Sequence, residues 1–267
     1  MTDPLERIAA ALERLSPPLP SSGDPLAYPA YVWRGGLVPA RDFQPLPIDL
    51  LIGIDRQKAA LLANLQRLAA GSAAQDVLLW GARGTGKSAL VKSAVAAVQA
   101  SGRDLALIEV AALAALPDLF ARLATIPRAF ALFVDDLGVD APGEARILRS
   151  LLEGGAEARP GNVRLMVTAN RRHVVPRDIA EQESAINPRD AVDDQLALAD
   201  RFGLSLGFHA VDQDAYLAIV AAYAERHELK YDPADAVRWA TRRGSRSGRV
   251  AWQYLVDLAG HAGRPLG

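Results

Sequence analysis

The sequence contains no cysteine among its 267 residues. Disulfide bonds, zinc sites with thiolate ligands and thiol nucleophiles are therefore excluded. It also lacks any apolar run of about 18 residues, the length that a membrane-spanning helix needs. Its first residues lack the basic start of a signal peptide. We therefore expect a cytoplasmic protein with no membrane partner.

The net charge is also small, and histidines are few. The formal net charge is −1, so no global charge excess draws the chain to nucleic acid. Its four histidines lie far apart in the sequence, and none has a metal-ligand spacing such as H-E-x-x-H, so we interpret them as surface or packing residues. They are His173, His209, His227 and His261. The remaining composition, 50% hydrophobic and 23% charged, is that of an ordinary globular protein.

Sequence patterns divide the chain into three parts. Residues 1–28 predict an amphipathic helix over 3–15, followed by a linker rich in proline and serine. Residues 29–210 alternate between helical patterns and short apolar runs, which predicts an α/β domain. Residues 211–267 predict a small helical subdomain. Its expected helices lie near 212–226, 233–243 and 249–261.

Five short apolar runs in the middle part predict a five-stranded parallel sheet that is buried on both faces. The runs are 77–80, 105–110, 130–134, 163–168 and 204–208. Helices are expected over 56–68, before the first run, and from 87 to about 100, after it. The fold class is therefore α/β with flanking helices.

A glycine-rich loop follows the first of these runs and matches G-x-x-x-x-G-K-[ST] in full. It consists of Gly81, Ala82, Arg83, Gly84, Thr85, Gly86, Lys87 and Ser88, and Ala89 continues into the helix. Glycines let backbone N–H groups surround an anion, and the helix N-terminus adds positive potential. Lys87 supplies a charge for the outer phosphates, and the Ser88 hydroxyl is a ligand for Mg²⁺. The sequence therefore predicts a P-loop NTPase that binds ATP and Mg²⁺.

Two carboxylates end the apolar run 130–134. A P-loop site needs an acidic group at the end of a neighbouring strand to hold Mg²⁺, and Asp135 has that position. Asp136 is placed to orient or polarise the attacking water. The alternative is that both residues only begin a solvated turn.

These motifs resemble the AAA+ ATPase superfamily over roughly residues 48 to 260. The segments 51–58, 79–88 and 243–249 are similar to a bacterial AAA+ group catalogued only as a domain of unknown function. The resemblance implies a nucleotide-binding domain with a C-terminal helical lid, and it implies no pathway.

The resemblance also implies site residues. Ile52, Gly53 and Ile54 match the segment that packs on adenine. Asn170 matches sensor 1, the polar side chain between the water-activating carboxylate and the γ-phosphate, although a capping role is the alternative.

The resemblance also implies roles for two arginines. Arg201 matches the arginine finger, which reaches the γ-phosphate of a neighbouring subunit, and its alternative is a surface salt bridge. Arg249 matches sensor 2 of the lid. It belongs to a basic cluster in which any member could contact phosphate or DNA: Arg242, Arg243, Arg246 and Arg249.

One residue departs from the superfamily pattern, because Asp136 stands where AAA+ enzymes usually have Glu. Asp is one methylene shorter, so its carboxylate ends roughly 1.5 Å further from the γ-phosphate. Slow hydrolysis is therefore an expectation alongside ATPase activity.

The leading hypothesis is an AAA+ ATPase that hydrolyses ATP to drive oligomer or partner remodelling, as a homo-oligomer in which Arg201 acts in trans. The alternative is a nucleotide-gated binding switch with little turnover. A P-loop phosphotransferase fits less well, because some 80 residues precede the loop. A DNA-associated loader stays open, since Arg171 and Arg172 add to the basic cluster, but no aromatic stacking motif accompanies them.

Overall fold

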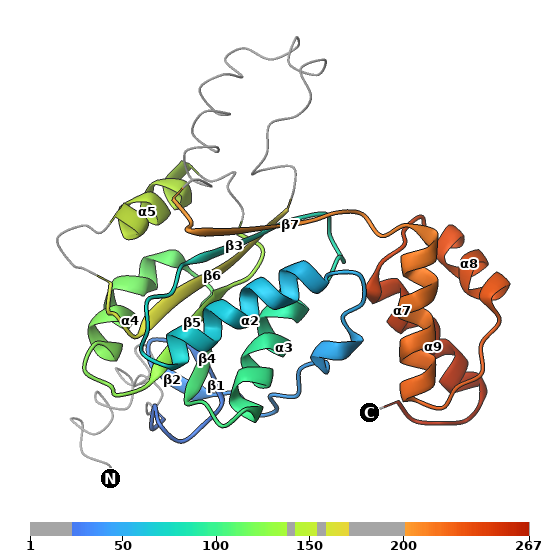
Figure 1. Ribbon diagram of the computed structural model, residues 1–267, viewed down its shortest axis with the longest axis horizontal. Coiled ribbons are helices and arrows are strands. Elements are labelled where there is room, and N and C mark those ends of the chain that lie inside the picture. The colour runs from blue at the N-terminus through green and yellow to red at the C-terminus, as the bar shows by residue number, and fades with distance from the viewer. Residues whose placement is uncertain (1–22, 138–141, 154–158, 171–200, 267) are drawn as a thin grey trace, which may run out of the picture.

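The computed structural model describes residues 23–137, 142–153, 159–170 and 201–266 (Figure 1). The expected helix over 3–15 lies outside these ranges, as do His173, Arg171 and Arg172. No helix in the described part of the chain is long and apolar enough to cross a membrane.

A seven-stranded sheet forms the centre of the molecule, with strand order β2-β1-β4-β5-β6-β3-β7. The strands are β1 (Ala30–Trp33), β2 (Leu37–Pro39), β3 (Val77–Gly81), β4 (Leu105–Glu109), β5 (Ala129–Val134), β6 (Val163–Asn170) and β7 (Leu204–Phe208). The five predicted strands are present and form the parallel part from β4 to β7.

Two strands at one edge of the sheet were not predicted. β1 pairs in parallel with β4, and β2 pairs antiparallel with β1 through a short turn at Gly35 and Gly36. The expected count of five is therefore too low. Strands of three and four residues in a segment rich in proline and glycine carry too little periodicity to be predicted.

Helices lie on both sides of the sheet. They are η1 (Ile48–Leu50), α2 (Asp55–Ala69), α3 (Lys87–Ala100), η2 (Leu113–Ala115), α4 (Leu116–Leu123), α5 (Pro142–Glu153), α7 (Gln213–Arg226), α8 (Pro233–Arg242) and α9 (Gly248–His261). Figure 1 shows α2 and α3 side by side over one face, and these two helices contact each other. Helix α4 lies on the other side.

Alternation along the strands explains the two layers. Leu78 and Leu132 point into a hydrophobic cluster with α4, whereas their neighbours Leu79 and Phe133 point into a second cluster with α2 and α3. Because both faces are buried, a slip of one residue would exchange the two clusters, so the register of the strands is fixed. Because these strands are parallel, their carboxyl ends lie together at one end of the sheet.

A separate three-helix cluster follows β7. Helices α7, α8 and α9 match the predicted segments to within one residue, and each begins at a side-chain cap, which Asp212, Asp232 and Ser247 provide. Their buried core is aromatic and aliphatic, and Leu50 of η1 contributes to it. We call α7–α9 the C-terminal bundle. It lies beside the sheet rather than over either face (Figure 1).

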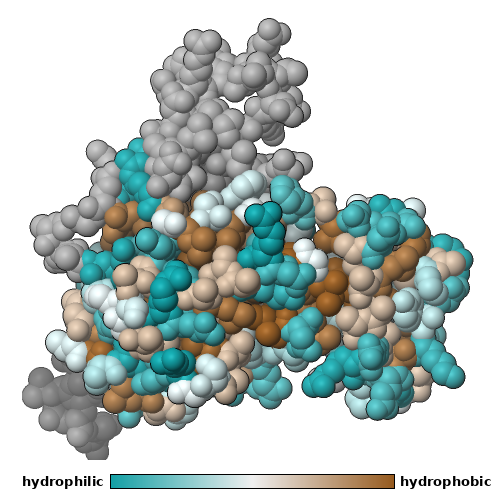
Figure 2. Space-filling model, viewed as in Figure 1, coloured by the Kyte–Doolittle hydropathy of each residue, from teal (hydrophilic) through white to brown (hydrophobic). Residues whose placement is uncertain are grey.

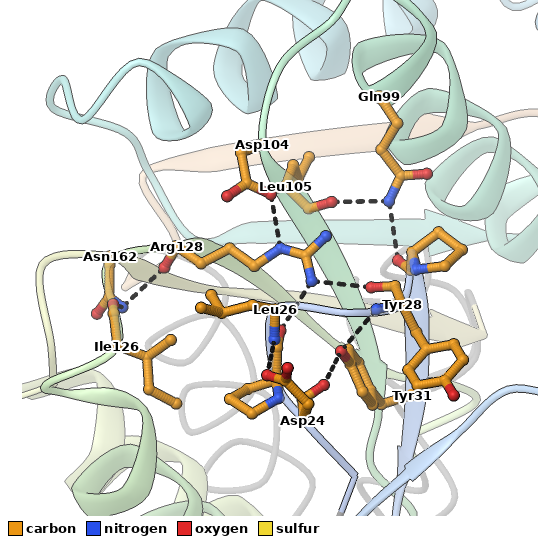
Figure 3. Close-up of polar contacts among 12 residues, drawn as sticks. Asp24, Leu26, Tyr28, Tyr31, Gln99, Asp104, Leu105, Ile126, Arg128 and Asn162 are labelled. Carbon is orange, nitrogen blue, oxygen red and sulfur yellow. Dashed lines mark hydrogen bonds and ion pairs between the residues drawn. The ribbon is translucent and has the colours of Figure 1, made fainter.

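Arg128 fastens the first described residues to the sheet (Figure 3). Its Nη1 donates to the backbone oxygens of Pro25 at 2.7 Å and Tyr28 at 2.8 Å. Its Nε lies 2.7 Å from Asp104 Oδ1, and only 8% of the Arg128 side chain is exposed. The described end of the expected linker is therefore attached to the sheet.

Tyr31 reinforces this attachment from β1. Its hydroxyl donates to the Asp24 backbone oxygen at 2.5 Å and accepts from the Tyr28 N–H at 2.9 Å (Figure 3). Both contacts lie at the edge of the sheet where β4 and β5 begin, opposite the ends that carry the glycine-rich loop.

Candidate nucleotide site

The glycine-rich loop begins where β3 meets its two neighbours. Gly81 is paired with Asn170 of β6 and with Phe208 of β7. Its φ is 142°, and a Cβ at this position would lie 2.1 Å from the Phe208 backbone oxygen. Gly86 ends the loop as the left-handed N-cap of α3, with φ 94°. The backbone path therefore requires glycine at both ends of the loop.

Lys87 spans the loop from inside. Its Nζ donates to the backbone oxygens of Gly81 at 2.8 Å and Ala82 at 2.7 Å, and the residue is 7% exposed. Burial lowers the pKa of Lys87, and the charges of Asp136 and Asp135 oppose that shift. Because an ammonium group has three donors, one N–H is left for an anion in the loop.

Asp135 joins the loop to the neighbouring strands. The Ser88 hydroxyl donates to Asp135 Oδ1 at 2.6 Å, and the Thr168 hydroxyl donates to the same oxygen at 2.7 Å. The loop hydroxyl and the strand-end carboxylate, which the sequence predicts as metal ligands, therefore lie in direct contact.

This donor set fits Mg²⁺. The ion prefers hard oxygen ligands and usually binds through one or two carboxylates together with water and substrate phosphates. Ser88 and Asp135 provide such oxygens beside the phosphate loop. No group of three or more His, Asp or Glu side chains gathers in the part of the chain that the structure describes, and a Mg²⁺ site of this kind does not need one.

Asp136 is held in an unusual conformation beside Asp135. Its φ is 51°, in the left-handed region, and its N–H donates to the Thr168 hydroxyl at 2.8 Å. Asn170 Nδ2 donates to Asp136 Oδ1 at 2.5 Å, and Arg83 Nη2 lies 3.6 Å from Oδ2. The structure thus brings together Asp136 and Asn170, the residue that the resemblance matches to sensor 1, and adds a contact with Arg83.

A cavity of about 870 Å³ opens beside the loop, between the sheet domain and the C-terminal bundle. The predicted base-binding segment, 52–54, lines it together with loop residues 84–89. Tyr223, Arg249 and Trp252 line it from the bundle. Figure 2 shows hydrophobic residues gathered where the two parts meet. An apolar wall next to a phosphate loop suits a nucleotide base.

The C-terminal bundle touches the loop directly. A Cβ on Gly84 would lie 2.9 Å from Ser247 Cβ, and Gly84 itself has a φ of 78°. Ser247 is the buried N-cap of α9, two residues before Arg249. The predicted sensor 2 arginine is therefore at the start of a helix that contacts the phosphate loop.

Arg201 lies far from the loop of its own chain. It precedes β7, whose Leu204 is paired with Val77 at the start of β3, whereas the loop follows Gly81 at the end of β3. Four residue steps along a strand correspond to roughly 13 Å. Arg201 is thus at the opposite edge of the sheet and is not part of the site that its own chain builds.

Some of the residues that line or support the site were not predicted from the sequence. The Thr168 hydroxyl donates to the Asp135 carboxylate and accepts from the backbone N–H of Asp136, and its signal is its place two residues before Asn170, on the same side of β6. His209 and His227, interpreted as ordinary residues, line the cavity, as do Tyr223 and Trp252. No local pattern indicates these cavity residues, because the packing of the bundle against the sheet brings them there.

The family described as "Protein of unknown function (DUF815)" matches residues 26–262. The chain belongs to this family. The match includes the loop, both carboxylates, Asn170 and the C-terminal bundle. No curated protein matches the chain.

Solved structures show what fold this family member has. The chain is similar to the RuvB Holliday junction branch migration motor of Thermotoga maritima, with 19% identity, a TM-score of 0.51, and coverage of 83% of this chain and 68% of that one. It is similar to the Aeropyrum pernix ORC2 protein (ADPNP–ADP complexes), with 16% identity, a TM-score of 0.54, and coverage of 84% and 67%. It is also similar to Aeropyrum pernix ORC1 in complex with DNA, with 17% identity, a TM-score of 0.54, and coverage of 84% and 66%. These likenesses confirm the predicted P-loop fold of the AAA+ type.

Proposed function

We propose that this chain is a Mg²⁺-dependent ATPase of the AAA+ type whose ATP cycle changes its own assembly or its grip on a partner macromolecule. The observation that carries the proposal is the 2.6 Å contact between the Ser88 hydroxyl and Asp135. Strand β5 and helix α3 bring these groups together at the mouth of a complete phosphate loop. A structural loop without a ligand has no need for a hydroxyl and a carboxylate there.

Phosphate groups would be held by the backbone N–H groups of residues 83–88, the N-terminus of α3 and Lys87. Mg²⁺, held by Ser88 and Asp135, would supply charge neutralisation for the phosphate oxygens. The base would lie in the apolar cavity against the segment 52–54, and Arg249 would approach the phosphates from α9. Each of these roles uses a group that already faces the loop or the cavity.

Asp136 would orient the attacking water, with Asn170 beside it. The contact between the two side chains supports this assignment, because an amide that donates to the carboxylate fixes where the second oxygen points. The short arm of Asp supports slow turnover rather than none, since misplacement by about 1 Å can lower a rate by roughly 100-fold.

Arg201 supports an oligomeric enzyme. Its place at the far edge of the sheet means that it could reach a phosphate only in a second subunit. A guanidinium supplied in trans stabilises the charge that develops in phosphoryl transfer. We therefore propose a homo-oligomer when ATP is bound, acting on a protein partner, and the exposed arginines of the bundle leave a nucleic-acid partner open.

The experiment measures ATP hydrolysis and particle mass with and without ATP and Mg²⁺. Wild type should hydrolyse ATP and assemble. Lys87→Ala should lose nucleotide binding, and Arg201→Ala should keep binding but lose hydrolysis and assembly. Lys230→Ala, which removes an exposed lysine between α7 and α8, is the matched control and should behave as wild type. Wild-type binding of ATP that Lys87→Ala leaves unchanged would refute the site.

A second candidate function is a nucleotide-gated switch with negligible turnover. The specific observation in its favour is that Asn170 and Arg83 already contact both oxygens of Asp136. In that case wild type binds ATP without turnover, and Asp136→Glu raises the rate. Robust hydrolysis by wild type would exclude the switch.

A further inference from the structure

The phosphate loop carries an additional cation. Besides Lys87, which lies buried under the loop, Arg83 projects from its outer side with 79% of its side chain exposed. The P-loop pattern requires the lysine but leaves the position of Arg83 free. Its charge is close enough to lower the pKa of Lys87. Because Arg83 and Lys87 repel each other, a further contact must account for the presence of Arg83 in the loop.

The side chain of Arg83 lies beside Asp136. Arg83 Nη2 is 3.6 Å from Asp136 Oδ2, while Asn170 Nδ2 donates to Oδ1 on the other side. The backbone of Asp136 is fixed as well, because its N–H donates to the buried Thr168 hydroxyl. Asp136 is therefore held at three points. Its backbone is held by Thr168 of β6, and its carboxylate is held by Asn170 of β6 and by Arg83 of the phosphate loop.

We propose that Arg83 is a positioning residue that holds the carboxylate of Asp136 in the orientation in which it directs water. The inference rests on the proposed ATPase function. The Asp side chain is one methylene shorter than the usual Glu and has one rotatable bond fewer, so it has less freedom to correct a carboxylate that points in the wrong direction. Groups that are already oriented need no reorganisation during the reaction, which is the source of the rate advantage.

The size of the effect follows from the exposure of the pair. Asp136 is 59% exposed on its side chain, and solvent screens such a contact. Loss of Arg83 should therefore reduce kcat about two- to five-fold, the range that corresponds to a screened ion pair. Nucleotide affinity should stay unchanged, because Arg83 acts through Asp136 and not on the phosphates.

The test measures kcat, KM and the Kd of ATP for wild type, Arg83→Ala and Arg83→Lys, each also in an Asp136→Asn background. Arg103→Ala is the matched control, since Arg103 is an exposed arginine beyond the far end of α3. We expect Arg83→Ala to lower kcat with the Kd of ATP unchanged, and Arg83→Lys to restore part of it. The effect should vanish when Asp136 is already Asn, whereas a structural role for Arg83 would lower the rate in both backgrounds.

Three results would overturn the inference while leaving the ATPase proposal intact. An unchanged kcat would show that the contact has no role, and a raised kcat would show that Arg83 restrains Asp136. If Arg83→Ala raises the Kd of ATP by the same factor in both backgrounds, Arg83 binds phosphate instead. Absence of wild-type turnover, in contrast, would refute the proposed function itself.

Discussion

Replacing Arg128 by Met should loosen the attachment of the chain's first described residues. Met keeps much of the apolar stem that Arg128 buries, so the change removes mainly the guanidinium and its contacts. Those contacts are two hydrogen bonds to the backbone oxygens of Pro25 and Tyr28 and an ion pair with Asp104, whose side chain is 63% exposed.

The magnitude follows from these three contacts. Hydrogen bonds to a charged group contribute about 1.5–3 kcal/mol each, but here water can reach part of the segment and replace the lost donors. The ion pair adds little because its acid is well exposed. We therefore expect Arg128→Met to lower the free energy of unfolding by about 2–3 kcal/mol.

Urea denaturation followed by tryptophan fluorescence measures this loss as a lower midpoint with an unchanged slope. Arg122→Met on α4, at an exposed position, is the control and should leave the midpoint unchanged. Chymotrypsin provides a local readout, because Leu26 is exposed and the bond between Leu26 and Ala27 becomes cleavable when the segment detaches. If the variant keeps both the wild-type midpoint and the wild-type cleavage rate, Arg128 does not hold this segment to the sheet.

Burial raises the pKa of Asp76, so wild type loses stability as the pH rises from about 4 through the raised pKa and the buried carboxyl ionises. The free energy of unfolding of Asp76→Asn, measured relative to wild type, should therefore increase between pH 4 and pH 7. A difference that does not change with pH would contradict this. Gly81→Ala should lower the stability by about 3 kcal/mol or more, because its Cβ would overlap the Phe208 backbone oxygen, and thermal unfolding tests it. Thr168→Val keeps the volume but removes a donor to Asp135, so the Mg²⁺ concentration for half-maximal hydrolysis should rise about tenfold. An unchanged Mg²⁺ titration would show that Asp135 needs no such support.

Much of the fold could be predicted from local patterns. The five parallel strands and the three helices of the C-terminal bundle each carry a clear apolar period or a capping residue, such as Asp212 before α7. The loop could be predicted because its glycines, Lys87 and Ser88 all lie within eight residues of the chain. The strands β1 and β2 could not be predicted, because β1 becomes a strand by pairing with β4, and β2 by pairing with β1, rather than through their own composition.

Outside the loop, residues of the candidate site could be predicted only where a polar residue of suitable chemistry stands at the end of a predicted strand. Asp135, Asp136 and Asn170 end adjacent strands, so the sheet itself brings them together. The only signal for Thr168 is its place two residues before Asn170, and Arg83 occupies a free position of the loop pattern. The contacts of both residues with Asp136 depend on the left-handed turn after β5. Side-chain partners across a turn of this kind follow from three-dimensional geometry that a single sequence does not specify.

The place of Leu50 affects how the protein can be divided. This residue precedes the sheet domain's first long helix, yet its side chain is in the core of the C-terminal bundle. A fragment that begins at Val211 would therefore fold around a vacancy about the size of one leucine, which costs roughly 2–5 kcal/mol in a packed core. Anyone who expresses the bundle separately, or exchanges it between relatives, should transfer the segment 46–52 with it or fill that vacancy from within.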